Sequence, residues 1–560
     1  MALQLTRLTF FAAPGQPGAA TTVTILVGPN NSGKSLALRE IAAWASGEDS
    51  VRQVIDEIDL DWPADAAAAE ALLEPLKTEP PAGQPSPVDA FFVSRFKVDG
   101  SQEARWIHRT HLDKLQRDAR SAPFRLSLSN LFTARLDGRT RFALVDERPW
   151  QDQQIPPQHH LAALFMNDGL RSRVRELVAA AFPGRYFVID PTGMGRFRVR
   201  VSDRPPADAA EERNWDERSQ SFHAAAVDIQ TQSDGVICFT GLVAAAISLS
   251  QMVLLVDEPE AFLHPPLARL LGTDLASQAA ERGASLVAAT HSAEFVMGCI
   301  ESGADTTIVR LTFESQSAGA RVLPAKELQK MMLDPLLRST SALSGLFHRG
   351  VIVGESDHDR AFYAEINRRL VAHGRGTPDT FFANAQNWQT IPRVVGPLRQ
   401  VGVAAAAIID LDTTVTGAKA EWRKFYAAVG VDQTAETALE AMRATTAGPL
   451  RAQGKNADGL VCKRTGLAAL SAADRARAQT YFAALADVGI FVVTAGELES
   501  WLPALGVSRS AKAKWIVDMF KALGSNPKGK AYVAPAAGDV WDFLDSVGAW
   551  IADPSRGGMP

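Results

Sequence analysis

The chain has 560 residues, of which 46% are hydrophobic and 22% charged, and a formal net charge of −5. At roughly 100–200 residues per domain, this length predicts about three to four domains, and the composition excludes long disorder, a collagen and a coiled-coil fibre. Three cysteines (Cys238, Cys299 and Cys462) without zinc-binding spacing exclude a disulfide framework and favour the cytoplasm. We expect no membrane-spanning segment, because every apolar run is much shorter than about 20 residues.

The first two apolar segments, residues 3–10 and 23–27, predict strands. Between the second strand and a helix expected from Lys34 onward lies the sequence GPNNSGKS, which matches the GxxxxGK[ST] pattern. In such a loop the backbone N–H groups hold phosphate oxygens, the lysine contacts the β- and γ-phosphates, and the last hydroxyl binds Mg²⁺. We therefore predict an ATP site with Mg²⁺, formed by Asn30, Asn31, Ser32, Gly33, Lys34 and Ser35.

An insertion is expected to follow the first helix. Residues 62–88 are rich in Ala and Pro and predict a short helix and then a mobile linker that opens the insertion. Strands are predicted at 186–189 and 196–201, and the polar stretch 203–221 is expected to close the insertion. Residues 91–150 contain 12 Lys+Arg against 7 Asp+Glu, which fits either a solvated charged face or a phosphate-contacting surface. The closely spaced basic residues are Arg95, Lys97, Arg105, Arg109, Arg117 and Arg120.

After residue 225 strands and helices alternate, which predicts a largely parallel sheet. The expected elements are a helix at 239–249, a strand at 253–256, a helix at 265–280 and a strand at 285–289. Two carboxylates follow the first of these strands. We expect Asp257 to hold the Mg²⁺ shell and Glu258 to polarise the attacking water. A structural role for His264 is favoured over contact with the nucleotide.

Three motifs in this region carry a family resemblance. VDEPEAFLHP at 256–265, followed by ATHS at 289–292, resembles the ABC-type ATPase heads. TQSDG at 231–235 resembles the signature variants of DNA-repair and phage-defence ATPases. The resemblance implies that His291 contacts the γ-phosphate region. It also implies that Ser233 and Gly235 complete the ATP site of a second subunit, and therefore a homodimer or higher homo-oligomer.

A second alternating pattern, with strands at 351–353, 381–383, 404–409 and 490–493, predicts another parallel sheet. Acidic residues follow three of these strands. Because the carboxyl ends of parallel strands face one crevice, we expect these carboxylates to converge, and a divalent cation would offset their repulsion. The acidic residues are Glu355, Asp359, Asp410, Asp412, Glu497 and Glu499.

The order of Glu, DxD and a late Glu resembles the TOPRIM fold of topoisomerases, primases and OLD (overcoming lysogenization defect) nucleases. An ABC-type head followed by TOPRIM is the OLD arrangement, which the Gabija nuclease subunit shares. The resemblance implies catalytic roles for Glu355 and Asp410, and a C-terminal lysine near the scissile phosphate, for which Lys530 is favoured over Lys528. It further implies Mg²⁺ or Mn²⁺ held by Glu355, Asp359, Asp410, Asp412 and Glu499.

The expected architecture is α/β. An ABC-type P-loop ATPase domain, with parts at 1–90 and 226–340, carries an inserted, mainly helical arm at 91–225. The arm is expected to contain β elements and to serve as a dimerisation region, and the ATPase domain is followed by a TOPRIM domain at 341–560. This arrangement implies an ATP-hydrolysing, metal-dependent DNA endonuclease or nickase that defends against phage or mobile DNA. Its expected partners are double-stranded DNA, further copies of the chain and a protein of the same defence system.

Two other functions are alternatives to the nuclease. The first is a DNA-sensing ATPase whose degenerate TOPRIM module binds or releases a partner without cutting, which Ser356 in place of the usual glycine favours. The second, a topoisomerase or primase, fits less well. Strand passage needs a tyrosine nucleophile, and none of the five tyrosines lies in a recognisable winged-helix context.

Overall fold

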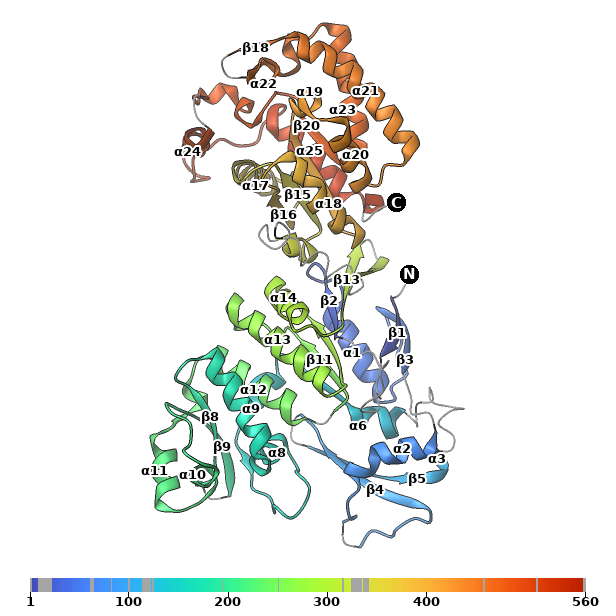
Figure 1. Ribbon diagram of the computed structural model, residues 1–560, viewed down its shortest axis with the longest axis vertical. Coiled ribbons are helices and arrows are strands. Elements are labelled where there is room, and N and C mark those ends of the chain that lie inside the picture. The colour runs from blue at the N-terminus through green and yellow to red at the C-terminus, as the bar shows by residue number, and fades with distance from the viewer. Residues whose placement is uncertain are drawn as a thin grey trace. The chain divides into compact units, whose positions relative to one another are not determined.

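The computed structural model divides the chain into two compact units (Figure 1). The first comprises residues 1–27 and 31–328, and the second comprises 28–30 and 329–560. The division therefore falls before the expected boundary at 341. The described residues are 3–8, 23–60, 65–81, 83–98, 101–112, 122, 125–193, 195–249, 251–314, 317–323, 335, 342–456, 459–509 and 512–556. Among them, no helix is long and apolar enough to span a bilayer.

A six-stranded sheet with the order β14-β13-β2-β12-β11-β6 forms the centre of the first unit. Five of its strands are parallel and β14 is antiparallel to β13, so the largely parallel sheet predicted from the alternating pattern is present. Strands β2, β11 and β12 have five residues each and are mostly apolar, which is typical of strands that are covered on both faces of a sheet. The strands are β2 (Val23–Val27), β6 (Thr133–Leu136), β11 (Val253–Asp257), β12 (Ser285–Ala289), β13 (Thr306–Glu314) and β14 (Ser317–Leu323).

Helix α1 (Lys34–Ala45) packs on this sheet through Leu38 and Ile41, which share a hydrophobic core with Leu255 and Val287. This packing holds the N-terminus of α1 near the carboxyl end of β2. The other helices of the sheet region are α12 (Asp234–Ser248), α13 (Pro265–Glu281) and α14 (Ala293–Glu301). Outside the sheet, β1 (Leu3–Leu8) pairs in parallel with β3 (Ile55–Leu60).

The expected single arm at 91–225 is wrong in one respect. Strand β6 lies within that range but pairs with β11 of the central sheet, so the chain leaves the sheet twice rather than once. The expected β elements are present beside the helices, where alternating apolar and polar residues produce strands. The first excursion contains α2 (Ala66–Leu73), the hairpin β4 (Ala90–Phe96) and β5 (Gln102–His108), α3 (Arg109–Leu112) and α6 (Asn130–Phe132).

The second excursion leads from β6 to α12 and forms an antiparallel sheet flanked by helices, with β8 and β7 both paired to β9. The polar stretch at 203–221 does not simply close the insertion, because most of it folds into two short helices. The elements are α7 (Thr140–Ala143), β7 (Arg148–Pro149), α8 (His160–Met166), α9 (Asp168–Ala181), β8 (Tyr186–Asp190), β9 (Arg196–Ser202), α10 (Ala209–Arg213), α11 (Glu217–Ala225) and β10 (Val227–Asp228).

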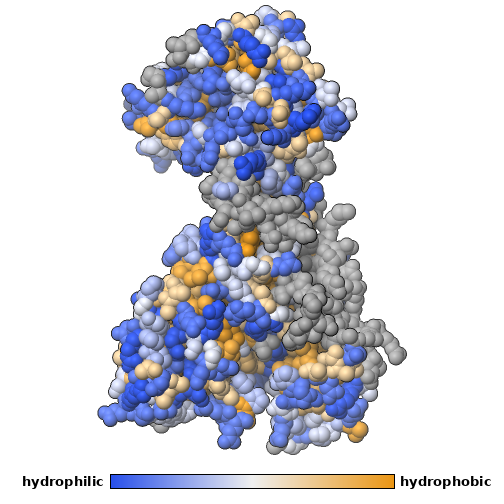
Figure 2. All heavy atoms as spheres, in the orientation of Figure 1, coloured by the Kyte–Doolittle hydropathy of each residue, from blue (hydrophilic) through white to orange (hydrophobic). Residues whose placement is uncertain are grey.

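The second unit is built on a four-stranded parallel sheet with the order β16-β15-β17-β20. Its strands agree closely with the predicted apolar segments. The face of this unit seen in Figure 2 is mostly hydrophilic with scattered apolar residues. The strands are β15 (Gly350–Gly354), β16 (Thr380–Asn384), β17 (Ala404–Asp410) and β20 (Ile490–Val493).

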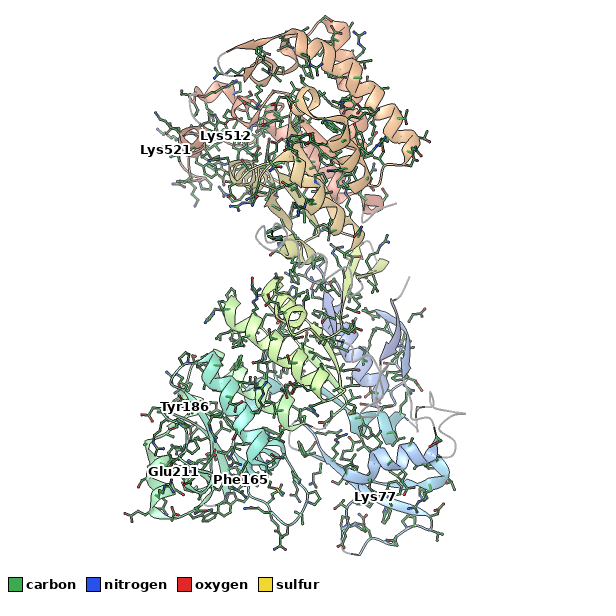
Figure 3. The ribbon with its side chains drawn as sticks, viewed as in Figure 1. Lys77, Phe165, Tyr186, Glu211, Lys512 and Lys521 are labelled. Atoms are coloured by element: carbon green, nitrogen blue, oxygen red, sulfur yellow. The ribbon has the colours of Figure 1, made fainter. Side chains whose placement is uncertain are left out.

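Helices cover both faces of this sheet. On one face, Ile352, Ala406 and Phe491 share a core with α17 (Asp357–Ala372), α24 (Lys512–Leu523) and α25 (Asp539–Ala552). Lys512 and Lys521 of α24 are labelled in Figure 3. On the other face lie α18 (Ile391–Gln400) and the helix packed on it, α20 (Lys419–Ala428). The remaining helices of the unit are α19 (Thr413–Thr416), α21 (Gln433–Ala452), α22 (Cys462–Thr465) and α23 (Ala472–Asp487).

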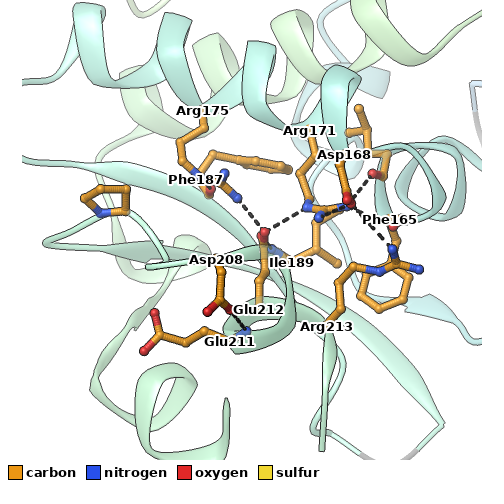
Figure 4. Close-up of polar contacts among 12 residues, drawn as sticks. Phe165, Asp168, Arg171, Arg175, Phe187, Ile189, Asp208, Glu211, Glu212 and Arg213 are labelled. Atoms are coloured by element: carbon orange, nitrogen blue, oxygen red, sulfur yellow. Dashed lines mark hydrogen bonds and ion pairs between the residues drawn. The ribbon is translucent and has the colours of Figure 1, made fainter. Parts of the chain in front are cut away.

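A buried ionic network holds the second excursion together (Figure 4). The carboxylate of Glu212 on α10, 1% exposed, accepts hydrogen bonds from Arg171 Nε at 2.7 Å, Arg175 Nη2 at 2.5 Å and the backbone amide of Ile189 at 3.0 Å. Arg171, 2% exposed, also donates to the carbonyl oxygens of Leu164 and Phe165. The network therefore joins helices α8, α9 and α10 to strand β8.

We predict that Glu212→Gln lowers the free energy of unfolding by about 3 kcal/mol, because it removes the buried charge that Arg171 and Arg175 share and leaves Arg171 with only the half-exposed Asp168 as an ionic partner. Urea unfolding measures this change. Glu217→Gln, on the exposed face of the next helix, serves as the control and should shift stability by no more than about 0.5 kcal/mol. Equal stability of the two variants would contradict a structural role for the network.

Candidate functional site

The glycine-rich loop after β2 has the backbone that a phosphate-binding loop requires. Gly33 has φ +94°, and a Cβ atom there would lie 2.9 Å from the Val54 side chain. Lys34 is the first residue of α1, and its buried Nζ donates to Ser32 Oγ at 3.3 Å. The helix N-terminus supplies backbone N–H groups and a positive dipole end for an anion. The other predicted residues of the loop, Asn30 and Asn31, are exposed.

Ser35 and Asp257 meet although 222 positions separate them, with Ser35 Oγ donating to Asp257 Oδ1 at 2.9 Å. The contact follows from the sheet order, which places only β12 between β2 and β11. Burial raises the pKa of Asp257, and the hydrogen bond from Ser35 opposes this shift. A hydroxyl and a carboxylate at one point are the oxygen ligands that Mg²⁺ prefers. These two residues fit the Mg²⁺ predicted beside the phosphates.

Glu258 and His291, predicted to act on the attacking water and the γ-phosphate, lie close together. Glu258 Oε1 is 4.0 Å from His291 Nε2. The backbone of Glu258 adopts a left-handed conformation, with φ 48°, and its amide donates to the Ala289 carbonyl at 2.8 Å. Glu260 Oε1 accepts the backbone amide of His291 at 2.7 Å, and burial raises the pKa of Glu260. The segment after β11 and the segment after β12 are thus bonded to each other.

Arg141 of α7 is a residue of this site that the sequence did not reveal. Its side chain is 1% exposed, and its Nη2 donates to the carbonyl oxygens of Asp257 at 2.8 Å and Glu258 at 2.7 Å. One guanidinium group therefore holds the backbone at the strained residue Glu258. No motif marks Arg141, since its partners are carbonyl groups more than a hundred positions away.

Ser233 and Gly235 lie at the N-terminus of α12. A Cβ atom on Gly235 would approach the Phe262 carbonyl oxygen to 2.9 Å, so this helix end is pressed against the segment after Glu260. Their role in the ATP site of a second subunit stays a prediction. The backbone carbonyl of His264 accepts the amides of Leu267 and Ala268 at the start of α13, its side chain is exposed, and the structural role favoured for that side chain stays a prediction.

The second unit brings two predicted carboxylates together at the carboxyl edge of its sheet. Glu355 follows β15 and Asp410 ends the neighbouring strand β17, and the Asp410 amide donates to Glu355 Oε1 at 3.0 Å. Burial and the charges of Asp359 and Asp412 raise the pKa of Glu355 to about 7, although the hydrogen bond from the Asp410 amide acts to lower it. Burial and the charges of Glu355 and Asp359 likewise raise the pKa of Asp410 well above its usual range.

Ser356 caps the helix that presents Asp359 to this edge. Its φ of −141° is extended and needs no glycine, and its hydroxyl accepts the Asp359 amide. The glycine that geometry does require is Gly354, where a Cβ atom would lie 2.8 Å from Asp359 Cβ. The Glu-Ser sequence is therefore compatible with the turn, and Asp359 is 3% exposed beside the other carboxylates.

The remaining predicted acids lie around the same edge. Asp412 Oδ2 is 3.2 Å from Lys463 Nζ, an ion pair that the sequence did not suggest. Glu499 is 6% exposed, and its Oε2 atom has no hydrogen-bond partner in the described part of the chain. Burial and the charge of Glu499 raise the pKa of Glu497, which lies 3.9 Å from Lys463.

Two lysines interact with these acids, Lys463 through its ion pair with Asp412, and Lys512, rather than the predicted Lys530. The charges of Asp359, Asp410, Glu499 and Glu355 raise the pKa of Lys512, although burial opposes them. Lys530 is instead an exposed residue of a turn beyond α24. The choice of Lys530 rested only on the apolar segment that follows it. A better signal was the basic sequence RSAKAK at 509–514, shortly after the late glutamates.

The acid cluster (Glu355, Asp359, Asp410, Asp412 and Glu499) has the donor chemistry of a hard-cation site. Carboxylate oxygens are the ligands that Mg²⁺ and Mn²⁺ prefer, and the raised pKa values and the unpartnered Glu499 oxygen indicate uncompensated negative charge. Within the described ranges, however, no three His, Cys, Asp or Glu side chains are close enough to hold a metal as they stand. A cation would have to draw these side chains closer together.

The basic residues predicted between 91 and 150 are bound mainly to neighbouring acids. Arg109 pairs with Glu70 at 3.0 Å and with Asp89 at 3.4 Å, and Lys97 pairs with Glu103 at 2.7 Å. Arg105 also contacts Glu103, and Arg95 is buried over the Phe132 ring. These contacts favour the charged-face interpretation. Arg117 and Arg120 lie outside the described residues.

Comparison with known families shows the type of domain formed by most of the first unit. A family model described as "AAA domain, putative AbiEii toxin, Type IV TA system" matches residues 23–297. The match spans the loop at Lys34, Asp257, Glu258 and His291. Residues 23–297 therefore form a P-loop ATPase domain, and ATP with Mg²⁺ is its cofactor. No curated protein sequence matches the chain.

Among solved structures, the similar chains include heads of SMC proteins. The SMC head bound to the C-winged helix domain of ScpA is 15% identical, with 56% of this chain and 93% of that chain covered and a TM-score of 0.32. The SMC head domain from Thermotoga maritima is 14% identical, with 55% and 90% covered and a TM-score of 0.26. An SMC head with an extended coiled coil from Pyrococcus furiosus is 14% identical, with 56% and 93% covered and a TM-score of 0.31.

We predict that Arg141→Met lowers kcat for ATP hydrolysis at least about tenfold while changing the Kd for ATP less than about threefold. The guanidinium group holds the backbone of Asp257 and Glu258 but touches no residue of the Lys34 loop that we describe. Steady-state kinetics and nucleotide binding by calorimetry separate the two effects. Arg139→Met, at an exposed position two residues away, is the control. Equal kcat values for the two variants would contradict the prediction.

We also predict a pH dependence of stability from Glu355. Its folded-state pKa of about 7 lies above the ordinary value of 4.5, so its protonation stabilises the folded state fully below pH 4.5, and this stabilisation is lost as pH rises through 7. In EDTA the free energy of unfolding should fall, by on the order of 2 kcal/mol, between pH 5 and pH 8. The decrease should be smaller in Glu355→Gln. An identical pH profile for both proteins would count against the raised pKa.

Proposed function

We propose that the chain is an ATP-hydrolysing, divalent-metal-dependent DNA endonuclease or nickase. The observation that carries this proposal is the meeting of Glu355 and Asp410 at the carboxyl edge of a parallel sheet, with Asp359 buried beside them. Buried carboxylates with raised pKa values are costly for stability and are typical of functional sites. Their order in the chain resembles that of TOPRIM nucleases, which supports phosphodiester hydrolysis over other metal chemistry.

In this mechanism a bound Mg²⁺ or Mn²⁺ would supply Lewis-acid stabilisation of the charge that develops on the phosphate. Glu355, Asp359, Asp410, Asp412 and Glu499 would hold it through carboxylate oxygens. Lys512 supplies positive charge for the nonbridging oxygens of the scissile phosphate.

The ATPase domain would act as a switch for this site rather than cut DNA itself. The resemblance to ABC-type heads supports ATP-dependent pairing of two copies, with Ser233 and Gly235 of one copy facing the nucleotide of the other. The resemblance to the OLD family supports double-stranded DNA as the substrate, a cytoplasmic role in defence against phage or mobile DNA, and a partner protein from the same defence system.

Cleavage of supercoiled plasmid tests the proposal. Purified protein with Mg²⁺ or Mn²⁺ should nick or linearise the plasmid, and Asp410→Asn and Glu355→Gln should each lower the rate at least about 100-fold, because each removes a charged ligand. Asp357→Asn is a matched control, since that carboxylate is exposed and paired with Arg360 at 3.0 Å. Cleavage that survives in Asp410→Asn would contradict this active site. Lys34→Ala, with and without ATP, then reports the direction of the ATP effect.

The second candidate is a DNA-sensing ATPase whose acid cluster binds or releases a partner without cutting. The observation in its favour is that, in the part of the chain described, no three potential ligands are already in metal-binding positions. Ser356 in place of glycine does not favour this candidate, because the backbone there is extended and needs no glycine. Normal ATP hydrolysis without plasmid cleavage under any divalent ion would favour this candidate.

A further inference from the structure

The segment after Gly506 is strongly basic. Most of its lysines have no role in the proposed active site. Residues 506–530 contain six Lys+Arg and one Asp. Lys512 faces the acid cluster, but the other four lysines of this segment do not contact it in any interaction described above. The exposed lysines are Lys514, Lys521, Lys528 and Lys530.

Helix α24 lies side by side with α17 and runs in the same direction. Near the beginning of both helices, the Trp515 ring lies 5.4 Å from the Phe362 ring. Near their ends, Arg369 Nη1 donates to the Leu523 carbonyl at 2.9 Å. Because α17 starts at the acid cluster, α24 also starts there and leads away from it. Its 12 residues extend about 18 Å.

The side of α24 that faces away from α17 combines positive charge with apolar surface. Trp515, Met519 and Leu523 are buried against the core. The opposite side exposes Lys514 and Lys521 together with Val517, 52% exposed, and Phe520, 38% exposed. Lysines with an exposed aromatic ring on the neighbouring part of the same helix surface are the combination that single-stranded nucleic acid binds, through its phosphates and its base faces.

The turn beyond α24 continues this basic side. Arg369 Nη1 donates to the Val533 carbonyl at 2.9 Å, its Nη2 donates to the Gly524 carbonyl at 2.5 Å, and its guanidinium lies over the Tyr532 ring. These contacts clamp residues 524–533 at the far end of α17, and Lys528 and Lys530 are exposed on this clamped turn. The four lysines are therefore spread from near the acid cluster to the end of the helix pair.

We propose that the exposed face of α24 and the turn after it form a docking track for one DNA strand, with Lys514, Lys521, Lys528 and Lys530 contacting phosphates and Phe520 stacking on a base. The strand is single at this point, since a duplex keeps its base faces covered. The inference rests on the proposed function, because it takes the acid cluster as the place where this strand is cut.

Binding of a fluorescein-labelled single-stranded oligonucleotide to the full-length protein, measured by anisotropy in EDTA, tests the track without requiring cleavage. Lys514→Gln/Lys521→Gln should weaken binding about tenfold and lower the slope of log K against log salt by about 1.4. Adding Lys528→Gln/Lys530→Gln should lower that slope by about a further 1.4. Arg423→Gln/Lys424→Gln is the matched control, because both residues are exposed on α20 at the opposite face of the sheet and Arg423 pairs with Glu436 as Lys521 pairs with Asp518.

Phe520→Ala tests the stacking contact and the commitment to a single strand. It should weaken binding of the single strand at least about fivefold and leave duplex binding within about twofold. Phe520→Leu, which keeps an apolar side chain, should lose affinity in the same way. Equal losses for single strand and duplex would overturn the assignment of a single strand, and a lysine variant that binds like the α20 control would overturn the track.

The nuclease proposal and the docking-track proposal can be rejected independently of each other. Binding that depends on α24 without any plasmid cleavage keeps the track and rejects the nuclease. Cleavage that depends on Asp410 with normal binding by the α24 variants keeps the nuclease and rejects the track.

Discussion

Parallel strand pairing is the constraint on which both candidate sites depend. It brings the carboxyl ends of neighbouring strands to one edge, so residues far apart in the chain meet there. In the first unit this edge joins Ser35 to Asp257, and in the second it joins Glu355 to Asp410, 55 positions apart. The same geometry therefore produces the phosphate and Mg²⁺ region of the ATPase domain and the acid cluster of the second unit.

The network around Glu212 and the acid cluster treat buried charge differently. In the network, Glu212 has two charged partners, Arg171 and Arg175. In the acid cluster, Glu355 and Asp410 are buried and face other carboxylates, so their pKa values rise. A satisfied network stabilises the fold, whereas an unsatisfied cluster costs stability and is retained where a ligand or a reaction needs it.

Two local details change the interpretation of the second unit. Ser356 stands where the family pattern has glycine, yet its extended backbone and helix-capping hydroxyl suit the turn, and the close approach is made by Gly354. The parallel packing of α24 on α17 brings Lys512 rather than Lys530 to the acids. Lys530 lies instead at the far end of the same helix pair, where a phosphate further along a strand is the natural partner.

The sequence by itself determined the features that depend on neighbouring residues. Apolar runs gave the strands of both sheets, the glycine-rich loop gave the phosphate site, and strand-terminal acids gave the cluster, because periodicity, backbone freedom and strand ends are local properties. Only the tertiary structure decided that β6 joins the central sheet, that Arg141 holds the backbone of Glu258, and that Lys512 faces the acids. The pairings of β6 with β11, of Arg141 with Glu258 and of Lys512 with Asp410 each join groups about a hundred positions or more apart, and no local pattern says which distant partner each will meet.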